Sequence, residues 1–310
     1  MLRQDVAAQA LELSANVLRP RMGFWAMVRA YIALTKPRII SLLLVTTVPT
    51  MIVANDGMPS LWLIVLTLIG GTLAAAGANT INCYIDRDID GIMARTRGRP
   101  LPAGAVEPER ALLFGLSLGA ASFVLLTFSV NLLSALLALA ALVFYVFVYT
   151  IWLKRITAQN IVIGGAAGAV PPLVGWAAVT GSLSWPALLL FGIIFLWTPP
   201  HFWALALRYR NDYARAGVPM LPVVRGEDET ARQIVLYSVA LVAASIALVP
   251  VASMGALYLA SALVLGGMFL WFALRLWRER TPQSCWALFT YSLAYLALLY
   301  VAMGADRLIA

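Results

Sequence analysis

The sequence predicts an all-helical, polytopic membrane protein with about nine transmembrane helices. Hydrophobic residues make up 62% of the 310 residues and charged residues only 12%, and the mean hydropathy is +0.87. A soluble domain carries about 25% charged residues, so this much apolar surface needs lipid as its solvent. Two further observations support the assignment. The chain contains apolar runs of membrane-spanning length, and its basic residues fall almost entirely on one side of the predicted membrane.

Nine apolar runs long enough to cross a bilayer follow one another along the chain. Short connections without Lys or Arg alternate between them with longer, basic connections. We therefore expect a polar N-terminal tail over residues 1–35 and a nine-helix transmembrane domain over residues 36–310. The predicted spans are 39–55, 61–83, 111–129, 132–153, 159–179, 185–207, 233–253, 255–277 and 285–304.

The basic residues predict the orientation of the bundle. Of the 22 Lys and Arg residues, 20 lie in the N-terminal segment or in the connections after the second, fourth, sixth and eighth spans, Arg275 lies at the end of the eighth span on the same side, and only Arg307 lies on the other side. Because cytoplasmic segments carry the excess of Lys and Arg, we expect a cytoplasmic N-terminus and a C-terminus outside. We expect a bacterial inner membrane, although an organelle membrane stays open. Topology also explains the net charge of +8 without a nucleic-acid partner.

A regular acidic motif closes the second predicted span. Asn82, Asp86 and Asp90 recur at every fourth residue, and on one continuous helix this spacing places all three side chains on one face. Like charges at this spacing repel each other, and a divalent cation that prefers oxygen ligands relieves the repulsion. The motif therefore predicts a Mg²⁺ site. The alternative is a solvated helix end whose carboxylates pair with Arg87 or Arg95.

Other charged side chains near the same face are candidates for holding a diphosphate. Guanidinium groups suit phosphate oxygens, although these arginines could also serve orientation alone. Asp212 is the only acid between Glu109 and Glu227, which makes it the best candidate for a second metal or diphosphate site. The basic and aromatic candidates are Arg95, Arg99, Tyr149, Lys154 and Arg155.

His201 is the only histidine in the chain and follows two prolines inside the sixth span. Prolines at membrane depth break or kink a helix and are tolerated where the backbone lines a cavity. The imidazole could therefore donate a proton or bind a haem iron. A hydrogen-bonded histidine between helices is the alternative, and both interpretations stay open.

The motifs resemble the UbiA superfamily of intramembrane prenyltransferases. The resemblance rests on Asn82, Asp86 and Asp90, on the run 86–101 and on the stretch 149–155. Within that superfamily, the stretch 200–220 is similar to the branch that farnesylates haem. Many relatives carry a second multi-aspartate motif, which is reduced here to Asp212. With the motif reduced in this way, we expect neighbouring side chains to take over diphosphate contacts: Tyr209, Arg210 and Asn211.

The resemblance implies a UbiA-type helical bundle with two cytoplasmic cap loops and a reaction that joins the farnesyl group of farnesyl diphosphate to a vinyl group of haem B, giving haem O and diphosphate. It implies Mg²⁺ as cofactor and a downstream haem A synthase or oxidase assembly protein as partner. An aromatic prenyltransferase of quinone synthesis is the alternative, and a multi-span transporter is disfavoured because the charges cluster at one surface. The implied site comprises catalytic Asn82, Asp86 and Asp90; diphosphate-binding Arg95, Arg99, Tyr149, Lys154, Arg155, Arg210 and Asp212; haem-binding His201; and metal ligands Asn82, Asp86, Asp90 and Asp212.

Overall fold

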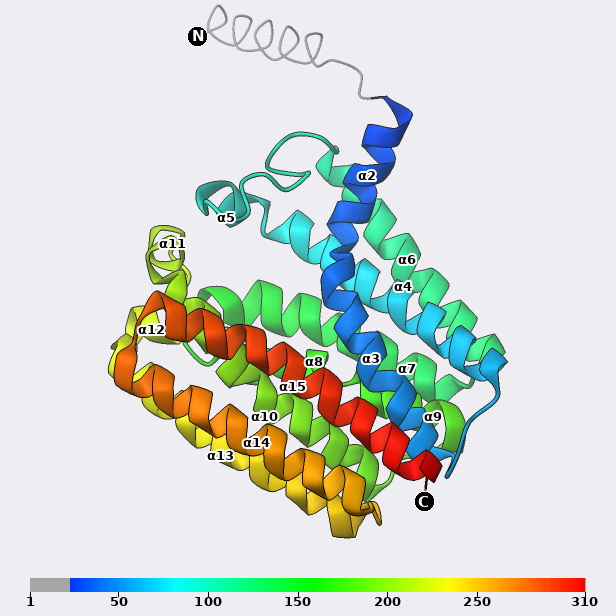
Figure 1. The fold of residues 1–310 in the computed structure, drawn as a ribbon. Coiled ribbons are helices and arrows are strands. Elements are labelled where there is room, and N and C mark those ends of the chain that lie inside the picture. Colours follow the sequence, from blue (N-terminus) through cyan, green and yellow to red (C-terminus); the bar gives the residue numbers. More distant parts are fainter. Residues whose placement is uncertain (1–22, 310) are drawn as a thin grey trace, which may run out of the picture.

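The computed structural model describes residues 23–309, and these residues form a helical bundle without strands (Figure 1). The expectations for residues 1–22 lie outside the described part. Nine helical segments within it are long and apolar enough to cross a membrane, which confirms the all-helical class and the predicted number of spans. They are α3 (Pro37–Ala54), α4 (Leu61–Ile85), α6 (Pro108–Ser129), α7 (Leu132–Val143) continued by η1 (Phe144–Trp152) and η2 (Leu153–Arg155), α8 (Asn160–Gly168) with α9 (Pro171–Thr180), α10 (Trp185–Arg208), α13 (Gly226–Val251), α14 (Ala256–Glu279) and α15 (Pro282–Ile309).

Several helices extend beyond the apolar runs that predict them. The seventh span was predicted from residue 233, whereas α13 begins at Gly226. Glu227, Asp228 and Glu229 occupy its first turn, where negative charge is stabilised by the positive end of the helix dipole. Apolar residues thus mark the lipid-facing length of a span, while the helix continues into polar surroundings.

The ends of the helices form two opposite faces. We refer to one of them as the basic face. It is formed by the starts of α3, α6, α8, α13 and α15 and by the ends of α4, η2, α10 and α14. α15 packs against α3, α10 and α14, so the last span contacts the first. α4 lies along α6, and a Cβ at Gly77 would lie 2.8 Å from the carbonyl oxygen of Gly115. The small residues therefore let these two backbones approach closely.

Residues 24–35, predicted as part of the tail, form a helix that packs on the bundle. This helix, α2 (Phe24–Thr35), contacts α4. Leu34 is fully buried, and the Asn79 amide donates to the Thr35 carbonyl at 3.0 Å. Lys36 joins α2 to α3 in a left-handed conformation, with φ 55°. Three shorter helices lie at the basic face: α5 (Arg87–Ile92), α11 (Arg210–Arg215) and α12 (Leu221–Val224).

A buried carboxylate joins the C-terminal helix to α14 at the opposite face. Asp306 is 5% exposed and accepts hydrogen bonds from the backbone N–H groups of Gly255, at 2.6 Å, and Tyr258, at 3.1 Å. These N–H groups have no partner within the helix, because they belong to its first turn. Asp306 therefore caps α14 from another element.

We expect Asp306→Ala to lower the free energy of unfolding by about 1–3 kcal/mol, because two N–H groups would lose their acceptor. Thermal unfolding in detergent measures the loss. Asp56→Ala is the matched control: Asp56 also contacts α15, through Arg307 at 2.9 Å, but its side chain is 81% exposed. An exposed pair contributes about 0–1 kcal/mol, so equal shifts in Tm would contradict the capping role.

Candidate active site

The acidic motif lies at a break between two helices. α4 ends at Ile85, Asp86 adopts φ −85° and ψ 4°, and α5 begins at Arg87. Asn82, Asp86 and Asp90 are therefore divided between two helices. The motif nevertheless stays together, because the Asp90 N–H donates to the Asp86 carbonyl at 2.8 Å. All three side chains are buried at the basic face.

The two carboxylates of the motif pair with cations from distant segments. The Lys154 ammonium contacts Asp86 Oδ2, which also accepts from Asn82 Nδ2 at 2.7 Å. Arg99 Nη1 lies 2.7 Å from Asp90 Oδ2. The structure thus brings together five of the predicted site residues. The alternative interpretation, a solvated helix end, expected Arg87 or Arg95 as partners of the carboxylates, but the observed partners are Lys154 and Arg99.

One oxygen of Asp86 is left without a hydrogen bond. Asp86 is fully buried, and its Oδ1 has no hydrogen-bond partner. The nearest cation is the Arg155 guanidinium, with Nη2 at 3.8 Å. Arg155 itself binds the exposed Asp88 through two contacts of 2.7 Å, and this hydrogen bonding lowers the pKa of Asp88 to about 2. The bare oxygen is the acceptor through which a further ligand can bind.

Lys36 belongs to the site although the sequence analysis assigned it to topology. Its Nζ donates to Asn82 Oδ1 at 2.7 Å, and burial lowers the pKa of Lys36 to about 8. The chain contains only two lysines, Lys36 and Lys154, and both contact the Asn82–Asp86 pair. The contrast with 20 arginines is a signal in the sequence that could have identified both lysines.

Aromatic side chains of η1 line the same region. Tyr149 stacks on Tyr145, with ring centroids 5.3 Å apart. Tyr149 also packs against Gly164 of α8, where a Cβ would lie 2.2 Å from the ring. Gly164 therefore makes room for the predicted tyrosine. Tyr145 was not predicted, because a tyrosine in an apolar span carries no distinctive spacing.

The two long connections at the basic face meet over the site. Ile89 and Met93 belong to the same apolar cluster as Tyr213. The Arg95 guanidinium lies 5.9 Å from the centroid of the Tyr209 ring. Burial raises the pKa of Tyr213, and the neighbouring Arg95 opposes this shift. α5 and α11 accordingly lie at the same end of the bundle (Figure 1).

Two residues predicted for the second cluster pair locally. Asp212 is 8% exposed and its carboxylate contacts Arg215, one turn along α11. Arg210 Nη1 lies 3.2 Å from Glu227 at the start of α13. The roles of Asp212 and Arg210 in diphosphate binding stay predictions, since their observed partners are Arg215 and Glu227 and not residues of the acidic motif.

The donor set at the motif fits a hard divalent cation. No cluster of three or more Asp, Glu, His or Cys side chains able to hold a metal ion is found within residues 23–309, so Asp212 does not complete such a cluster with Asp86 and Asp90. Mg²⁺, however, typically takes only one or two carboxylates and fills its other positions with phosphate oxygens and water. The buried, bare Oδ1 of Asp86 suits this role.

His201 is enclosed between α10 and α15. Its ring stacks on Trp197 and Phe289, with centroids 4.3 and 4.6 Å away, and Nδ1 lies 2.7 Å from Ser292 Oγ. α10 continues through Pro199 and Pro200, so, of the predicted break or kink, a break is absent. The haem-binding role of His201 stays a prediction. Because Ser292 engages Nδ1, a haem iron would have to bind Nε2.

We expect His201→Ala to lower Tm in detergent, because the substitution removes two stacking contacts and one hydrogen bond between helices. A haem B titration of the same variant separates the two interpretations. If Nε2 binds the iron, the variant also loses the shift of the Soret band that the wild type shows. Ser292→Ala is the matched control, since it removes the Nδ1 partner and leaves Nε2 in place.

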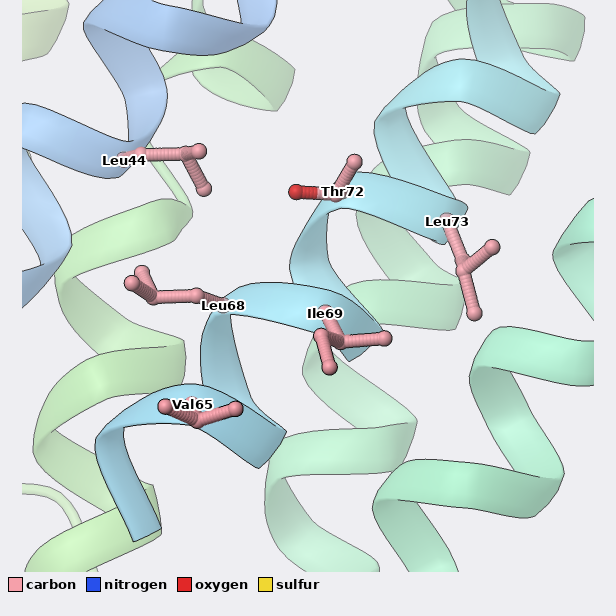
Figure 2. A pocket seen from close by; sticks show the side chains of 6 residues that line it. All are labelled: Leu44, Val65, Leu68, Ile69, Thr72 and Leu73. Carbon is pink, nitrogen blue, oxygen red and sulfur yellow. The ribbon is translucent and has the colours of Figure 1, made fainter. Parts of the chain in front are cut away.

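The surface of the described residues is hollowed beside the acidic motif and along the apolar body of the bundle. One hollow has a volume of about 450 Å³ and lies beside the Asp88–Arg155 pair, between Ile85 and Ile151. Another is an apolar groove of about 380 Å³ between α3 and α4 (Figure 2). The groove lies away from the acidic motif, toward the start of α4, and offers a surface for hydrocarbon chains. Its lining residues are Leu44, Val65, Leu68, Ile69, Thr72 and Leu73.

Solved structures share this fold. The chain aligns over 92% of its length with 99% of a digeranylgeranylglyceryl phosphate synthase, with a TM-score of 0.75 and 18% sequence identity. It aligns over 89% of its length with 99% of a UbiA homologue from Archaeoglobus fulgidus bound to GPP and Mg²⁺, with a TM-score of 0.61 and 17% identity. At these identities the likeness establishes the fold.

Sequence relatives are much closer. The chain is 56% identical to protoheme IX farnesyltransferase of Frankia alni over 92% of this chain and 99% of that protein. It is 57% identical to the protein of that name from Symbiobacterium thermophilum, over 93% and 97%. A relative of the same name from Roseiflexus sp. is 54% identical over 99% of the chain, which spans 59% of that longer protein. Residues 43–299 match the UbiA prenyltransferase family, and the chain therefore belongs to this family.

Proposed function

We propose that the protein transfers the farnesyl group of farnesyl diphosphate to a vinyl group of haem B and releases haem O and diphosphate. The observation that carries this proposal is the 54–57% identity, over 92–99% of the chain, to relatives named protoheme IX farnesyltransferase. The cations and carboxylates gathered at the basic face support it, because a diphosphate leaving group needs this environment.

The residues at the basic face neutralise the departing diphosphate. The bond between C1 of farnesyl and the diphosphate oxygen breaks, and the leaving group carries away the electron pair. Lys36, Lys154 and Arg99 then stabilise the negative charge that develops on the phosphate oxygens. A vinyl carbon of haem B bonds to C1, water adds to the resulting haem-side cation, and one proton is lost, so that haem O and diphosphate are the products.

Asn82, Asp86 and Asp90 are the residues proposed to hold Mg²⁺, with Asp212 as a further candidate. When bound, the ion would supply charge that stabilises the leaving diphosphate, and the binding of GPP and Mg²⁺ by the Archaeoglobus fulgidus homologue supports a dependence on Mg²⁺. The carboxylates of Asp86 and Asp90 would hold the cation, and Lys154 and Arg99, which now contact these carboxylates, would be available to phosphate oxygens. Removal of divalent cations by EDTA is accordingly expected to abolish turnover and Mg²⁺ to restore it.

We also propose a location and a downstream partner for the protein. The nine apolar helices within residues 23–309 and the membership in the UbiA family make the chain a multi-pass membrane protein. We place the protein in a bacterial inner membrane, and the one-sided basic residues support an orientation with the basic face in the cytoplasm, where a soluble diphosphate head group can enter. A haem A synthase or an oxidase assembly protein would receive haem O.

The test uses purified protein in detergent with haem B, farnesyl diphosphate and Mg²⁺, and mass spectrometry of the product. We expect haem O. An aromatic prenyltransferase of quinone synthesis would instead prenylate 4-hydroxybenzoate and leave haem B unchanged. Spectral titration with haem B provides an independent measurement, since an enzyme acting on aromatic rings has no need of a porphyrin site.

A further inference from the structure

The fourth span changes its winding where it passes the site. η1, Phe144–Trp152, is a π-helix, in which each backbone N–H bonds the carbonyl five residues earlier and the turn is wider than in an α-helix. Such turns are rare and frequently lie at functional sites. η1 carries Thr150 and is followed directly by η2, which carries Lys154. The winding thus determines which side chains of this span face Asn82 and Asp86.

The Thr150 hydroxyl has a fixed direction. Thr150 is fully buried, and its Oγ1 donates to the Tyr145 carbonyl, five residues earlier, at 2.8 Å. Thr50 and Thr80, which lie in α-helices, donate instead to the carbonyl four residues earlier. A hydroxyl has a single proton. Because that proton is used within η1, Thr150 Oγ1 serves every other neighbour as an acceptor.

This acceptor decides which way the Asn82 amide points. Asn82 Nδ2 donates to Thr150 Oγ1 at 3.0 Å and to Asp86 Oδ2 at 2.7 Å. Both amide protons are thereby used, and Oδ1 must face the opposite side, where Lys36 Nζ lies at 2.7 Å. A flipped amide would direct its oxygen toward two acceptors and its protons toward an ammonium group. Thr150, Asp86 and Lys36 therefore exclude the flipped orientation together.

The Asn82 amide in turn orients the Asp86 carboxylate. Oδ2 receives both Asn82 and Lys154, whereas Oδ1 is buried without a hydrogen bond. We infer that Thr150 is a positioning residue: through Asn82 it sets the Asp86 carboxylate so that one oxygen stays free for the cation that accompanies the diphosphate. The inference rests on the proposed function, because it concerns the metal site of that reaction.

The experiment measures cation binding without turnover. Mn²⁺ replaces Mg²⁺ and is followed by electron paramagnetic resonance in the presence of farnesyl thiodiphosphate, a substrate analogue whose C–S bond resists cleavage. We expect Thr150→Val to weaken Mn²⁺ binding about 10–100-fold, as loss of an outer-sphere partner does at other metal sites. Thr150→Ser keeps the hydroxyl and restores binding. Thr80→Val is the matched control, since this buried hydroxyl bonds only its own helix.

A double-variant cycle separates positioning from packing. If Thr150 acts through Asn82, Thr150→Val adds no further loss in an Asn82→Ala background. Wild-type Mn²⁺ affinity in Thr150→Val, or a loss that adds fully to that of Asn82→Ala, overturns the inference. Should Thr150→Val not fold, Thr150→Ala provides the same comparison. A wild-type protein that binds Mn²⁺ with the analogue but makes no haem O refutes the proposed function and leaves this inference intact.

Discussion

Replacing Asp86 by Asn is expected to lower kcat by about 10³-fold while the protein stays folded. The amide has nearly the volume of the carboxylate and keeps an oxygen toward Lys154, but the negative charge proposed to hold the cation is lost. Removal of one group that stabilises developing charge typically costs about 10²–10³-fold in kcat, and Asp86 contacts Lys154 in addition to its proposed role as a metal ligand. Haem O formation in a single turnover measures the effect, with thermal unfolding as the check on folding.

Asp88→Asn is the matched control for this prediction. It makes the same chemical change two residues away, but the Asp88 side chain is 57% exposed and binds Arg155 at the outer edge of the site. An exposed ion pair contributes about 0–1 kcal/mol, so we expect kcat to fall by less than about fivefold. Similar losses in both variants would show that negative charge at this end of α4, and not a metal ligand, is what matters.

The fold was predictable because its main determinants are local along the chain. A span needs about 20 apolar residues, and the rule for basic residues acts on the connections between spans. Both properties can be read without knowing any contact. The ends of the helices were predicted less well, because α13 continues into polar residues whose helical state depends on charge and packing at the basic face.

The site was predictable in its centre and not in its surroundings. The four-residue spacing identified Asn82, Asp86 and Asp90, although the helix breaks at Asp86. The side chains that hold the motif come from 46 and 68 residues away, namely Lys36 and Lys154. No spacing rule covers such distances. The π-helix was missed for a similar reason, since apolar residues over nine positions do not distinguish it from an α-helix.

The second large effect is expected for Lys36, the residue whose role the sequence analysis did not identify. We expect Lys36→Met to lower kcat/KM for farnesyl diphosphate about 10²-fold. The substitution removes a positive charge that lies 2.7 Å from Asn82 and that is proposed to stabilise the leaving diphosphate. Steady-state rates of haem O formation at several concentrations of farnesyl diphosphate measure this loss.

Arg38→Met tests whether orientation in the membrane explains the effect instead. Arg38 lies two residues from Lys36 in the same basic segment, but it is exposed on α3. The positive-inside rule counts the two residues equally, so a purely topological role predicts the same small change for both variants. A site role predicts a loss for Lys36→Met alone. Lys36→Arg sharpens the comparison, because it keeps the charge for topology but replaces a compact ammonium by a planar guanidinium. If the lysine is required for its fit against Asn82, the arginine variant inserts normally and still loses activity.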